Sequence, residues 1–454
     1  MLISLVARPA RVGERDTERY MGWSAALQRF RDDWDAGKRP GAYRLADYLS
    51  TVEDDDRPEA LQDLIAEHLR RSWESGPGPE LEEYGTALRD VCPALGSSST
   101  VPADLVEDEF LARHVPPHGD APSLSDYESR FPSRPDILVL LRSRCLHGNR
   151  YVLHRRIGTG AMGVVWEAFD CRVGRLVAVK TPRPEARRDA EVLSRFCAEA
   201  RLTAGLDHPG IVGVHDIHLE GEDAPFYVMR LVRGRTFGER IREYHRPAVE
   251  PAPGQKRTLW RELVRSFVGV CDAVAHAHAC GILHRDLKPG NILVGASGET
   301  VILDWGLAGN GEGAGGASEV IAGTPDYMPP EQAEGRAEVR SDVFGLGAVL
   351  YEVLTARAPH DWGAGKPRPR GWQEDVKQAR ITPPRRINRR APRALEAVCL
   401  KALSREVCAR YPSAAALARD VREYLAGGRV SAVRETFIGR IRCLLFGPRG
   451  EGMP

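Results

Sequence analysis

The most constraining feature of the chain is one short stretch, residues 284–291, which is followed closely by Asp304. The stretch reads His-Arg-Asp-Leu-Lys-Pro-Gly-Asn, so it carries a carboxylate at Asp286, an ammonium at Lys288 and a carboxamide at Asn291. Amide and carboxylate oxygens are hard ligands that suit Mg²⁺ on a polyphosphate. Asp286 is then left to orient a hydroxyl group, while Lys288 can neutralise the charge of a phosphoryl group in transfer.

The residues that follow this stretch predict a β-hairpin. Residues 292–294 and 301–303 read as short strands, and the turn 295–298 joins them. Such a hairpin would hold Asn291 and Asp304 close together at one end of the strand pair.

The stretch resembles the catalytic loop of protein kinases, and Asp304-Trp305-Gly306 resembles the metal-binding triplet of that family. The resemblance implies an α+β fold with two lobes, a small β-rich one and a large helical one. It implies ATP and Mg²⁺ as cofactors, with Mn²⁺ as an alternative, and Asn291 and Asp304 as metal ligands. Asp286 becomes the catalytic base or hydroxyl-orienting group, and Lys288 stabilises the transferring group. Trp305 stands where the family usually has Phe, so we expect altered packing and retained chemistry.

A glycine-rich turn lies between two segments that read as strands, residues 151–157 and 164–169. A dinucleotide-binding fold needs a helix after such glycines, whereas 164–169 is rich in β-branched and aromatic residues. Strand, glycine turn and strand is the kinase arrangement, in which backbone N–H groups approach phosphates without a Cβ in the way. The residues expected to contact ATP here are Ile157, Gly158, Thr159, Gly160 and Gly163.

Lys180 ends the next predicted strand, 176–180, and precedes a predicted helix over 190–206. The resemblance implies that Lys180 contacts the α- and β-phosphates and pairs with a glutamate on that helix. Glu199 matches best, because the rival Glu191 lies too near the start of the helix. The pair should serve positioning rather than stability.

The resemblance also assigns an adenine pocket. Its walls would be Val165, Ala178 and Leu293, and its back Met229. Its polar edge would be the carbonyl of Arg230 and the backbone groups of Val232. The family often has Glu where Arg230 stands, and bonding through the backbone tolerates that change.

Lys288 and Thr324, the latter in Gly-Thr-Pro, resemble the serine/threonine class of the family, so protein Ser and Thr hydroxyls are the expected acceptors. The segment 309–318 is too glycine-rich to hold one shape. We hypothesise that phosphorylation of Ser318, and less favourably of Thr324, adds charge that Arg285 captures, which would order this segment. The alternative is a permanently mobile linker.

Two long-range contacts also follow from the resemblance. Glu331 in Met-Pro-Pro-Glu should pair with Arg410, and Asp342 should brace the catalytic loop through His278. A long helix is predicted over residues 259–280, after a Pro-rich surface insertion at residues 247–255.

The motif Leu-x-x-Tyr occurs three times in the first part of the chain, at 45–48, 81–84 and 124–127. Leu and Tyr at this spacing share a helix face, and Pro- and Gly-rich breaks separate the copies. We therefore expect a small array of short helices. The repeat could form a docking surface for a partner, or its side chains could form the core of the array, which is the favoured reading.

Composition excludes several classes of protein. The 454 residues have a net charge of +1, which gives no support for nucleic-acid binding. The nine cysteines are scattered, contain no C-x-x-C pair and read as reduced thiols. No apolar run approaches the ~20 residues of a membrane span, and the start of the chain does not resemble a signal sequence. The predicted location is the cytoplasm.

These features divide the chain into an extension, 1–147, a kinase domain, 148–426, and a basic amphipathic tail, 427–454. The lobes of the kinase domain are predicted at 148–232 and 233–426. Apolar residues at helical spacing in the tail favour packing on the helical lobe over contact with an anionic membrane. Other functions stay open: an ATP-binding scaffold without catalysis, an adaptor acting through the extension, and a small-molecule kinase, since a fold does not fix its substrate.

Overall fold

The structure is a computed structural model, and it describes residues 17–53, 56–88, 97–114, 122–160, 163–219, 224–246, 252–305, 309–310, 323–361 and 371–433. Ser318 and the tail residues 434–454 lie outside these ranges, so the predictions made for them are not tested.

The chain forms two compact units. The first comprises Met1–Thr159 with Val165–Val179, and the second Gly160–Val164 with Lys180–Pro454. The strands at residues 163–170 and 175–182 cross the boundary and contribute to both units.

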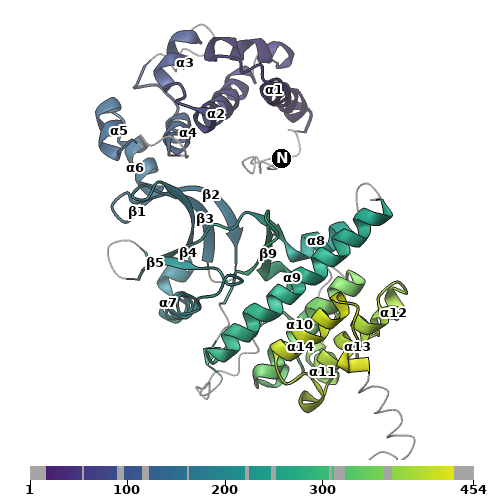
Figure 1. Ribbon diagram of the computed structural model, residues 1–454. Helices are drawn as coiled ribbons and strands as arrows, with labels where there is room; N and C mark the ends of the chain where they lie inside the picture. Colours follow the sequence, from purple (N-terminus) through teal and green to yellow (C-terminus); the bar gives the residue numbers. More distant parts are fainter. Residues whose placement is uncertain are drawn as a thin grey trace, which may run out of the picture. The chain divides into compact units, whose positions relative to one another are not determined.

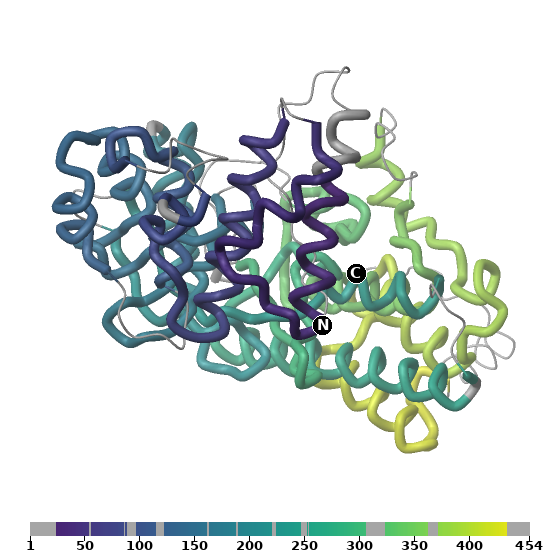
Figure 2. The backbone as a smooth tube through the Cα atoms, turned by 90° about the horizontal axis from the view of Figure 1, so that it is seen from above, coloured from purple at the N-terminus to yellow at the C-terminus, as the bar shows by residue number. Residues whose placement is uncertain are grey.

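The first unit begins with the helical array that the sequence predicted (Figure 1). Its helices are α1 (Thr17–Asp35), η1 (Ala42–Thr51), α2 (Arg57–Ser75), α3 (Leu81–Ala87), α4 (Ala103–Arg113), α5 (Leu124–Arg130) and α6 (Pro135–Ser143). Helices α1 and α2 lie side by side and pack on η1 (Figure 2). Pro58 occupies the first turn of α2, where its missing N–H costs no hydrogen bond.

The three copies of the Leu-x-x-Tyr motif lie in η1, α3 and α5, and most of their Leu and Tyr side chains belong to the core of the array. Each tyrosine also contacts a polar side chain on a preceding helix through its hydroxyl: Tyr48 contacts Asp33 at 2.9 Å, Tyr84 contacts His68 at 2.5 Å and Tyr127 contacts Glu109 at 3.2 Å. The burial of these residues supports the core reading of the repeat.

His68 shows how one of these contacts is ordered. Its Nε2 lies 2.9 Å from the Pro40 carbonyl, which can only accept, so Nε2 carries the proton. Burial lowers the pKa of His68 and keeps the ring neutral, so Nδ1 accepts the hydroxyl proton of Tyr84.

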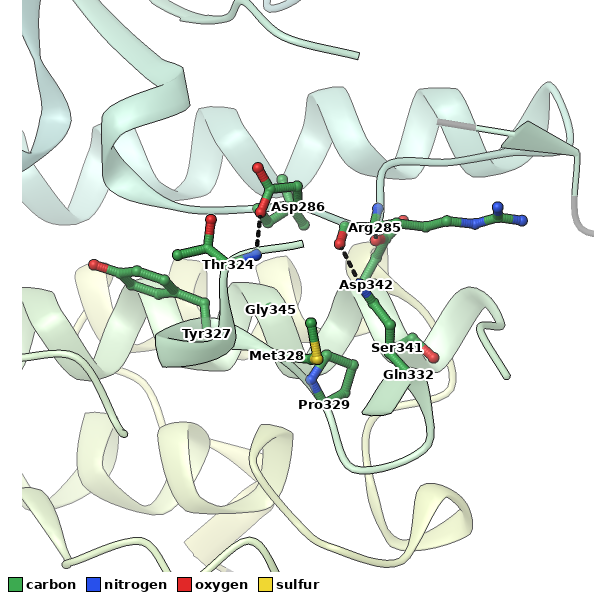
Figure 3. A pocket seen from close by; sticks show the side chains of 11 residues that line it. Arg285, Asp286, Thr324, Tyr327, Met328, Pro329, Gln332, Ser341, Asp342 and Gly345 are labelled. Carbon is green, nitrogen blue, oxygen red and sulfur yellow. Dashed lines mark hydrogen bonds between the residues drawn. The ribbon is translucent and has the colours of Figure 1, made fainter. Parts of the chain in front are cut away.

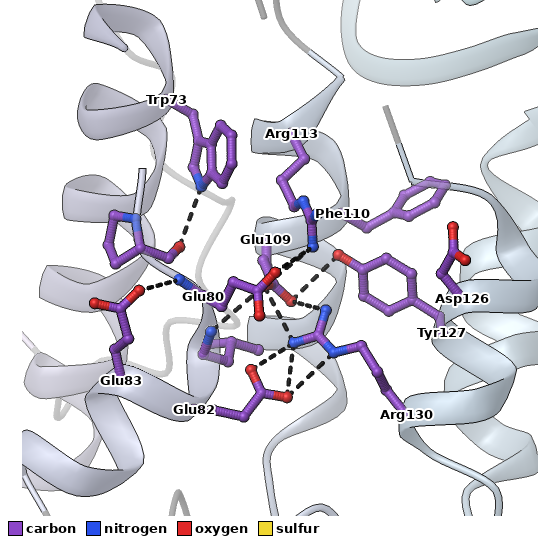
Figure 4. Close-up of polar contacts among 12 residues, drawn as sticks. Trp73, Glu80, Glu82, Glu83, Glu109, Phe110, Arg113, Asp126, Tyr127 and Arg130 are labelled. Atoms are coloured by element: carbon purple, nitrogen blue, oxygen red, sulfur yellow. Dashed lines mark hydrogen bonds and ion pairs between the residues drawn. The ribbon is translucent and has the colours of Figure 1, made fainter. Parts of the chain in front are cut away.

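Glu109 on α4 is the charged centre of the array, since its side chain is fully buried (Figure 4). Its carboxylate accepts hydrogen bonds from Tyr127 at 3.2 Å and from both terminal nitrogens of Arg130 at 3.1 and 3.2 Å. Arg130 in turn pairs with Glu82 on α3 at 2.6 Å. Burial nevertheless raises the pKa of Glu109, so the fold depends on keeping Arg130 in place.

The array continues without a break into a β-sheet. The strands β1 (Cys145–Leu146), β2 (Tyr151–Thr159), β3 (Gly163–Asp170) and β4 (Arg175–Pro182) are neighbours in the sheet in that order. Strands β1 and β2 are antiparallel, with Cys145 opposite Val152. Val152 belongs to the same apolar core as the helices, so the array and the first strands form one packed body.

The second unit contains the remaining elements. In chain order these are η3 (Ala186–Arg188), α7 (Ala190–Ala204), β5 (Val214–His218), β6 (Phe226–Met229), β7 (Gly234–Thr236), α8 (Phe237–His245), α9 (Pro253–Ala279), β8 (Ile282–Leu283), η4 (Pro289–Asn291), β9 (Ile292–Gly295), β10 (Thr300–Ile302), β11 (Gly309–Asn310), η5 (Pro325–Tyr327), η6 (Gln332–Glu334), α10 (Val339–Thr355), α11 (Trp372–Gln378), α12 (Pro384–Ile387), α13 (Arg393–Ala402), η7 (Val407–Ala409) and α14 (Ala414–Leu425).

Helix α10 is the centre of this unit, because its residues from Ser341 to Thr355 are all buried. Helices α9 and α13 pack on it, and α14 packs along α9 (Figure 1). The helix predicted over 259–280 begins earlier in the structure: α9 starts at Pro253, inside the predicted Pro-rich insertion. Proline at the first helical position lacks an N–H that the helix would leave unpaired, so it favours this start.

The predicted hairpin is confirmed. Strands β9 and β10 are antiparallel, with Ile292 opposite Ile302 and Val294 opposite Thr300. The pair is extended by β7, whose Thr236 lies opposite Leu293. The mixed content of a curled sheet and a largely helical region confirms the predicted α+β, kinase-like fold.

Near the end of the described chain, the carboxylate of Asp420 on α14 accepts the N–H of Ser431 at 2.8 Å and that of Ala432 at 3.1 Å. Val430 and Ala432 are buried in the core of this unit. Within the described helices, none combines the length and the apolar character that a bilayer crossing requires.

Candidate active site

Asp286 lies at the centre of the polar groups that the sequence singled out. Its Oδ2 accepts a hydrogen bond from Lys288 Nζ at 2.6 Å, and its Oδ1 accepts the backbone N–H of Thr324 at 2.8 Å. Asn291 Nδ2 donates to the Asp286 carbonyl at 3.1 Å. These bonds fix the direction of the carboxylate, which a group that orients a hydroxyl requires.

Lys288 links the catalytic stretch to the segment around Thr324. Its ammonium donates to Asp286 and also to Thr324 Oγ1, at 2.7 Å. The charge of Lys288 is therefore held beside the carboxylate that would meet the acceptor hydroxyl, where charge stabilisation has the greatest effect.

A buried carboxylate on α10 holds the backbone of the catalytic stretch. Asp342 Oδ2 accepts the N–H of His284 and Oδ1 that of Arg285, at 2.8 and 2.9 Å. His278 Nε2 lies 2.8 Å from the same carboxylate, so the predicted brace through His278 is confirmed. Burial works to raise the pKa of Asp342, but the hydrogen bond from His278 and the backbone bonds outweigh it, and the pKa lies below its usual value.

The hairpin brings the two expected metal ligands to one end, because the Leu303 N–H donates to the Asn291 carbonyl at 2.9 Å. Asn291 turns its Nδ2 toward Asp286, which leaves its Oδ1 as an available oxygen donor. The Asp304 carboxylate lies 3.7 Å from Lys180 Nζ, and its side chain is 45% exposed. One amide oxygen and one accessible carboxylate are a donor set that fits a divalent cation of the Mg²⁺ type.

Lys180 on β4 pairs with Glu199 on α7. Nζ and Oε1 are 2.5 Å apart, and both side chains are almost completely buried. Tyr227 on β6 donates a second hydrogen bond to the same oxygen at 2.9 Å. Burial raises the pKa of Glu199 despite the ammonium of Lys180. The expected partner is confirmed, whereas Glu191 forms a solvent-exposed pair with Arg195.

The glycine turn approaches the backbone of β4 very closely. The Gly160 N–H donates to the Gly163 carbonyl at 2.9 Å and closes the turn. A Cβ on Gly163 would lie 2.5 Å from the Thr181 carbonyl oxygen, so no larger residue fits without a backbone shift. Arg183 Nε donates to the Gly160 carbonyl at 2.8 Å. Nothing in the sequence pattern predicts this last contact.

The residues expected to bind adenine fall in both units. In the second unit, Met229 ends β6 and is buried, the Arg230 N–H donates to the Gly213 carbonyl at 2.8 Å, and Leu293 lies on β9. Val165 and Ala178 lie in the first unit, with Val165 3.7 Å from the position of a Cβ on Gly158. Ile157, also in the first unit, is 41% exposed. Their roles toward a nucleotide remain predictions.

Trp305 fills an apolar position in the core of the second unit, as expected from its size. It is 1% exposed, and its ring centroid lies 4.7 Å from that of His284. Its Nε1 makes no hydrogen bond to any residue that the structure describes. The ring therefore packs against the residue that opens the catalytic stretch.

A small pocket lies beside the catalytic stretch (Figure 3). Asp286 and Leu287 contribute to one side, and Tyr327, Met328 and Pro329 contribute to the other. Gln332 Nε2 donates to the Arg285 carbonyl at 2.7 Å and ties the two sides together.

The segment that lines this pocket is anchored by a buried ion pair. Glu331 accepts two hydrogen bonds from Arg410, at 2.6 and 2.8 Å, and a third from Ser341 at 2.6 Å. The Arg410 side chain is fully buried. The predicted pair is thus confirmed, and its fork geometry fixes the direction of the segment.

The fold and these contacts are those of a protein kinase, and a family model agrees. Residues 151–415 match the protein kinase domain, which is more than half of the chain, so the chain belongs to the protein kinase family.

Three similar proteins come from bacteria. The chain is 34% identical over 295 residues to a Bifidobacterium longum protein described as "Probable serine/threonine-protein kinase PknB", covering 62% of this chain and 41% of that protein. It is 34% identical over 306 residues to serine/threonine-protein kinase PknD of Protochlamydia amoebophila, covering 61% and 30%. It is 41% identical over 216 residues to serine/threonine-protein kinase PknA of Mycobacterium tuberculosis, covering 46% and 48%. The chain thus spans less than half the length of these relatives.

Proposed function

We propose that the chain is an ATP-dependent serine/threonine protein kinase that acts in bacterial signalling and phosphorylates itself. The observation that carries the proposal is the cluster in the second unit, where Lys180 contacts both Glu199 and Asp304 while Lys288 and Asn291 contact Asp286. The names of the relatives support the serine/threonine class.

In this proposal the oxygen of a Ser or Thr hydroxyl forms a bond to the γ-phosphorus of ATP. The bond between that phosphorus and the β–γ bridging oxygen breaks, and ADP leaves. Asp286 orients the hydroxyl and receives its proton. One carboxylate oxygen must first become free, which requires that the hydrogen bond from the Thr324 N–H or the one from Lys288 breaks. The transition state is loose, so alignment and charge neutralisation by Lys288 matter more than proton removal.

Asn291 and Asp304 would hold the divalent cation, which we propose to be Mg²⁺, with Mn²⁺ as an alternative. A cation bound there would neutralise charge on the phosphate oxygens. Lys180 would bind the α- and β-phosphates, with Glu199 fixing its direction. Val165, Ala178, Leu293 and Met229 would enclose the adenine. Arg230 and Val232 would bond its edge, and Gly158 to Gly163 would cover the phosphates.

Two features favour a protein acceptor over a small molecule. Thr324, in the segment that begins with Gly323, donates its backbone N–H to Asp286 and accepts a hydrogen bond from Lys288 through its hydroxyl. The Glu331–Arg410 pair fixes the residues that follow this segment. Transfer of labelled phosphate from γ-labelled ATP to a generic protein acceptor tests the proposal. If the wild type transfers no phosphate, the non-catalytic scaffold is favoured. The Asp286→Asn variant measures the background labelling of the assay.

Partner docking through the N-terminal helices is a second proposal. The buried Leu and Tyr residues of the repeat cannot provide such a surface, but Tyr43 on η1 is 72% exposed and could. Deleting residues 1–145 and measuring phosphate transfer and partner capture separately would distinguish an adaptor from a kinase, with the full chain as control. We further propose a cytoplasmic location. Peripheral membrane contact through the tail would involve residues 434–454, which lie outside the described structure.

A further inference from the structure

Arg183 lies directly after β4, three residues beyond Lys180, and its side chain reaches the glycine turn. Nε donates to the Gly160 carbonyl at 2.8 Å, and the same residue, Gly160, closes the turn by donating to Gly163. All of these residues belong to the second unit. The turn is therefore attached to the end of β4 by a side chain as well as by the close approach of Gly163 to Thr181.

The charge of Arg183 is not neutralised by an ion pair. No salt bridge joins its guanidinium to a carboxylate in the described part of the chain, although most arginines of the array have one. On the neighbouring helix α7, Glu191 is already paired with Arg195. A half-buried cation beside a glycine turn is thus left with two terminal nitrogens that can still donate.

We propose that Arg183 is a positioning residue for the phosphates of the nucleotide. It holds Gly160 at the end of β4 through the Gly160 carbonyl, and so fixes the start of the glycine turn that the proposed function places over the phosphates. Its terminal nitrogens add positive charge at the same place. A guanidinium can do both at once, because its planar fork offers separate donors to a carbonyl and to a phosphate. The inference rests on the proposed ATP-dependent function and adds a phosphate-recognition residue to that site.

The experiment compares Arg183→Ala, Arg183→Lys and the control Arg187→Ala in the full chain. Arg187 lies on η3, is exposed and makes no ion pair within the described ranges, so its replacement removes the same charge from the same segment. The readouts are KM and kcat for ATP in phosphate transfer, and the Kd values of ATP, ADP and adenosine. Each variant is also checked for an unchanged unfolding midpoint.

Arg183→Ala should raise KM and the Kd values of ATP and ADP by about tenfold, because a charge-assisted hydrogen bond is lost. The Kd of adenosine and kcat should change by less than about threefold. Arg183→Lys should recover part of the loss, since the charge returns without the fork, and Arg187→Ala should resemble the wild type.

Unchanged ATP affinity in Arg183→Ala would overturn the inference, and so would an equal loss for ATP and adenosine, which would indicate a general disturbance of the site. If Arg183→Ala does not fold, Arg183→Lys decides: wild-type phosphate affinity in a variant that cannot form the fork would count against the proposal. Failure of the proposed function would look different, since the wild type would then transfer no phosphate while the binding comparison still tests Arg183.

Discussion

Asp342 Oδ1 accepts the backbone N–H of Arg285 at 2.9 Å, and Arg285 is a non-glycine residue with a φ of 67°. This left-handed conformation is unfavourable for a side chain, so it persists only where the surroundings enforce it. The buried Asp342 supplies that enforcement, because it also accepts the N–H of His284. The direction of Asp286, the next residue, depends on this carboxylate on α10.

We predict that Asp342→Asn weakens the catalytic stretch. An amide offers one acceptor where a carboxylate offers two, so one buried N–H loses its partner at a cost of roughly 1–3 kcal/mol. The pKa of Asp342 is depressed, so its stabilisation is present above the usual value of 3.8 and is lost only as pH falls through the folded-state pKa. The variant's loss should therefore be constant between pH 5 and 8. Denaturant unfolding measures it, and the exposed Asp375→Asn on α11 is the control.

Arg410→Ala should destabilise the second unit by about 3–5 kcal/mol, because it leaves the carboxylate of Glu331 buried without its cation. Arg422→Ala breaks an ion pair with Asp272 whose side chains are 50% and 39% exposed, and it should cost less than about 1 kcal/mol. Denaturant unfolding measures the loss in the free energy of unfolding. Equal losses in the two variants would contradict the claim that the buried ion pair matters more than the exposed one.

Lys180→Met should lower phosphate transfer by roughly 10²–10³-fold, since a positioned donor to the phosphates is lost. Glu199→Gln should lower it less, because the ammonium remains but its direction is no longer fixed. Glu191→Gln is the matched control on the same helix and should retain wild-type transfer, because Glu191 forms a solvent-exposed ion pair with Arg195. Single-turnover transfer to a protein acceptor is the measurement.

Asp304→Asn should raise the Mg²⁺ concentration needed for half-maximal transfer by more than about tenfold, because a neutral amide replaces a charged oxygen ligand. Glu299→Gln makes the same chemical change at the other end of the hairpin, on an exposed side chain, and should leave the Mg²⁺ titration unchanged. Titrating both variants at fixed ATP decides the point, and a shift common to both would argue against a specific ligand.

His114 at the end of α4 should make the array sensitive to acid. Burial lowers the pKa of its ring from 6.5 to about 4, so the folded state binds fewer protons than the unfolded state between these values. Stability is therefore full above pH 6.5 and falls by about 3 kcal/mol as the pH drops to 4. His114→Phe should remove this part of the acid sensitivity in thermal unfolding. The exposed His147→Gln should keep it.

The catalytic stretch and the hairpin could be predicted because the residues that define them are close in sequence. Asp286, Lys288 and Asn291 lie within residues 286–291, and the strand pattern places Asp304 beside Asn291. Arg183 could not be found in the same way. A single arginine after a strand reads as a solvent-exposed charge, and only the path of the backbone brings Gly160 within its reach.

Tyr227 was missed for a related reason. Its hydroxyl meets Glu199 across 28 positions of the chain, and nothing in a strand pattern marks one tyrosine as a donor to a distant carboxylate. The Leu-x-x-Tyr repeat was visible in the sequence, but whether its side chains face solvent or the core depends on the packing of the array. The start of α9 differs from the predicted start because proline occurs both in irregular segments and at the first position of helices. The sequence alone does not separate these two uses of Pro253.

The tyrosine contacts of the array have a consequence for how the protein is made. Each hydroxyl finds its partner 15, 16 or 18 residues earlier in the chain, on a helix that leaves the ribosome first. Each such contact closes only a short loop, which costs little entropy and forms quickly, so a helix pair can close without waiting for the residues that follow it. The array can therefore assemble from its N-terminus, step by step, and offer a finished surface to the strands of the sheet as they emerge.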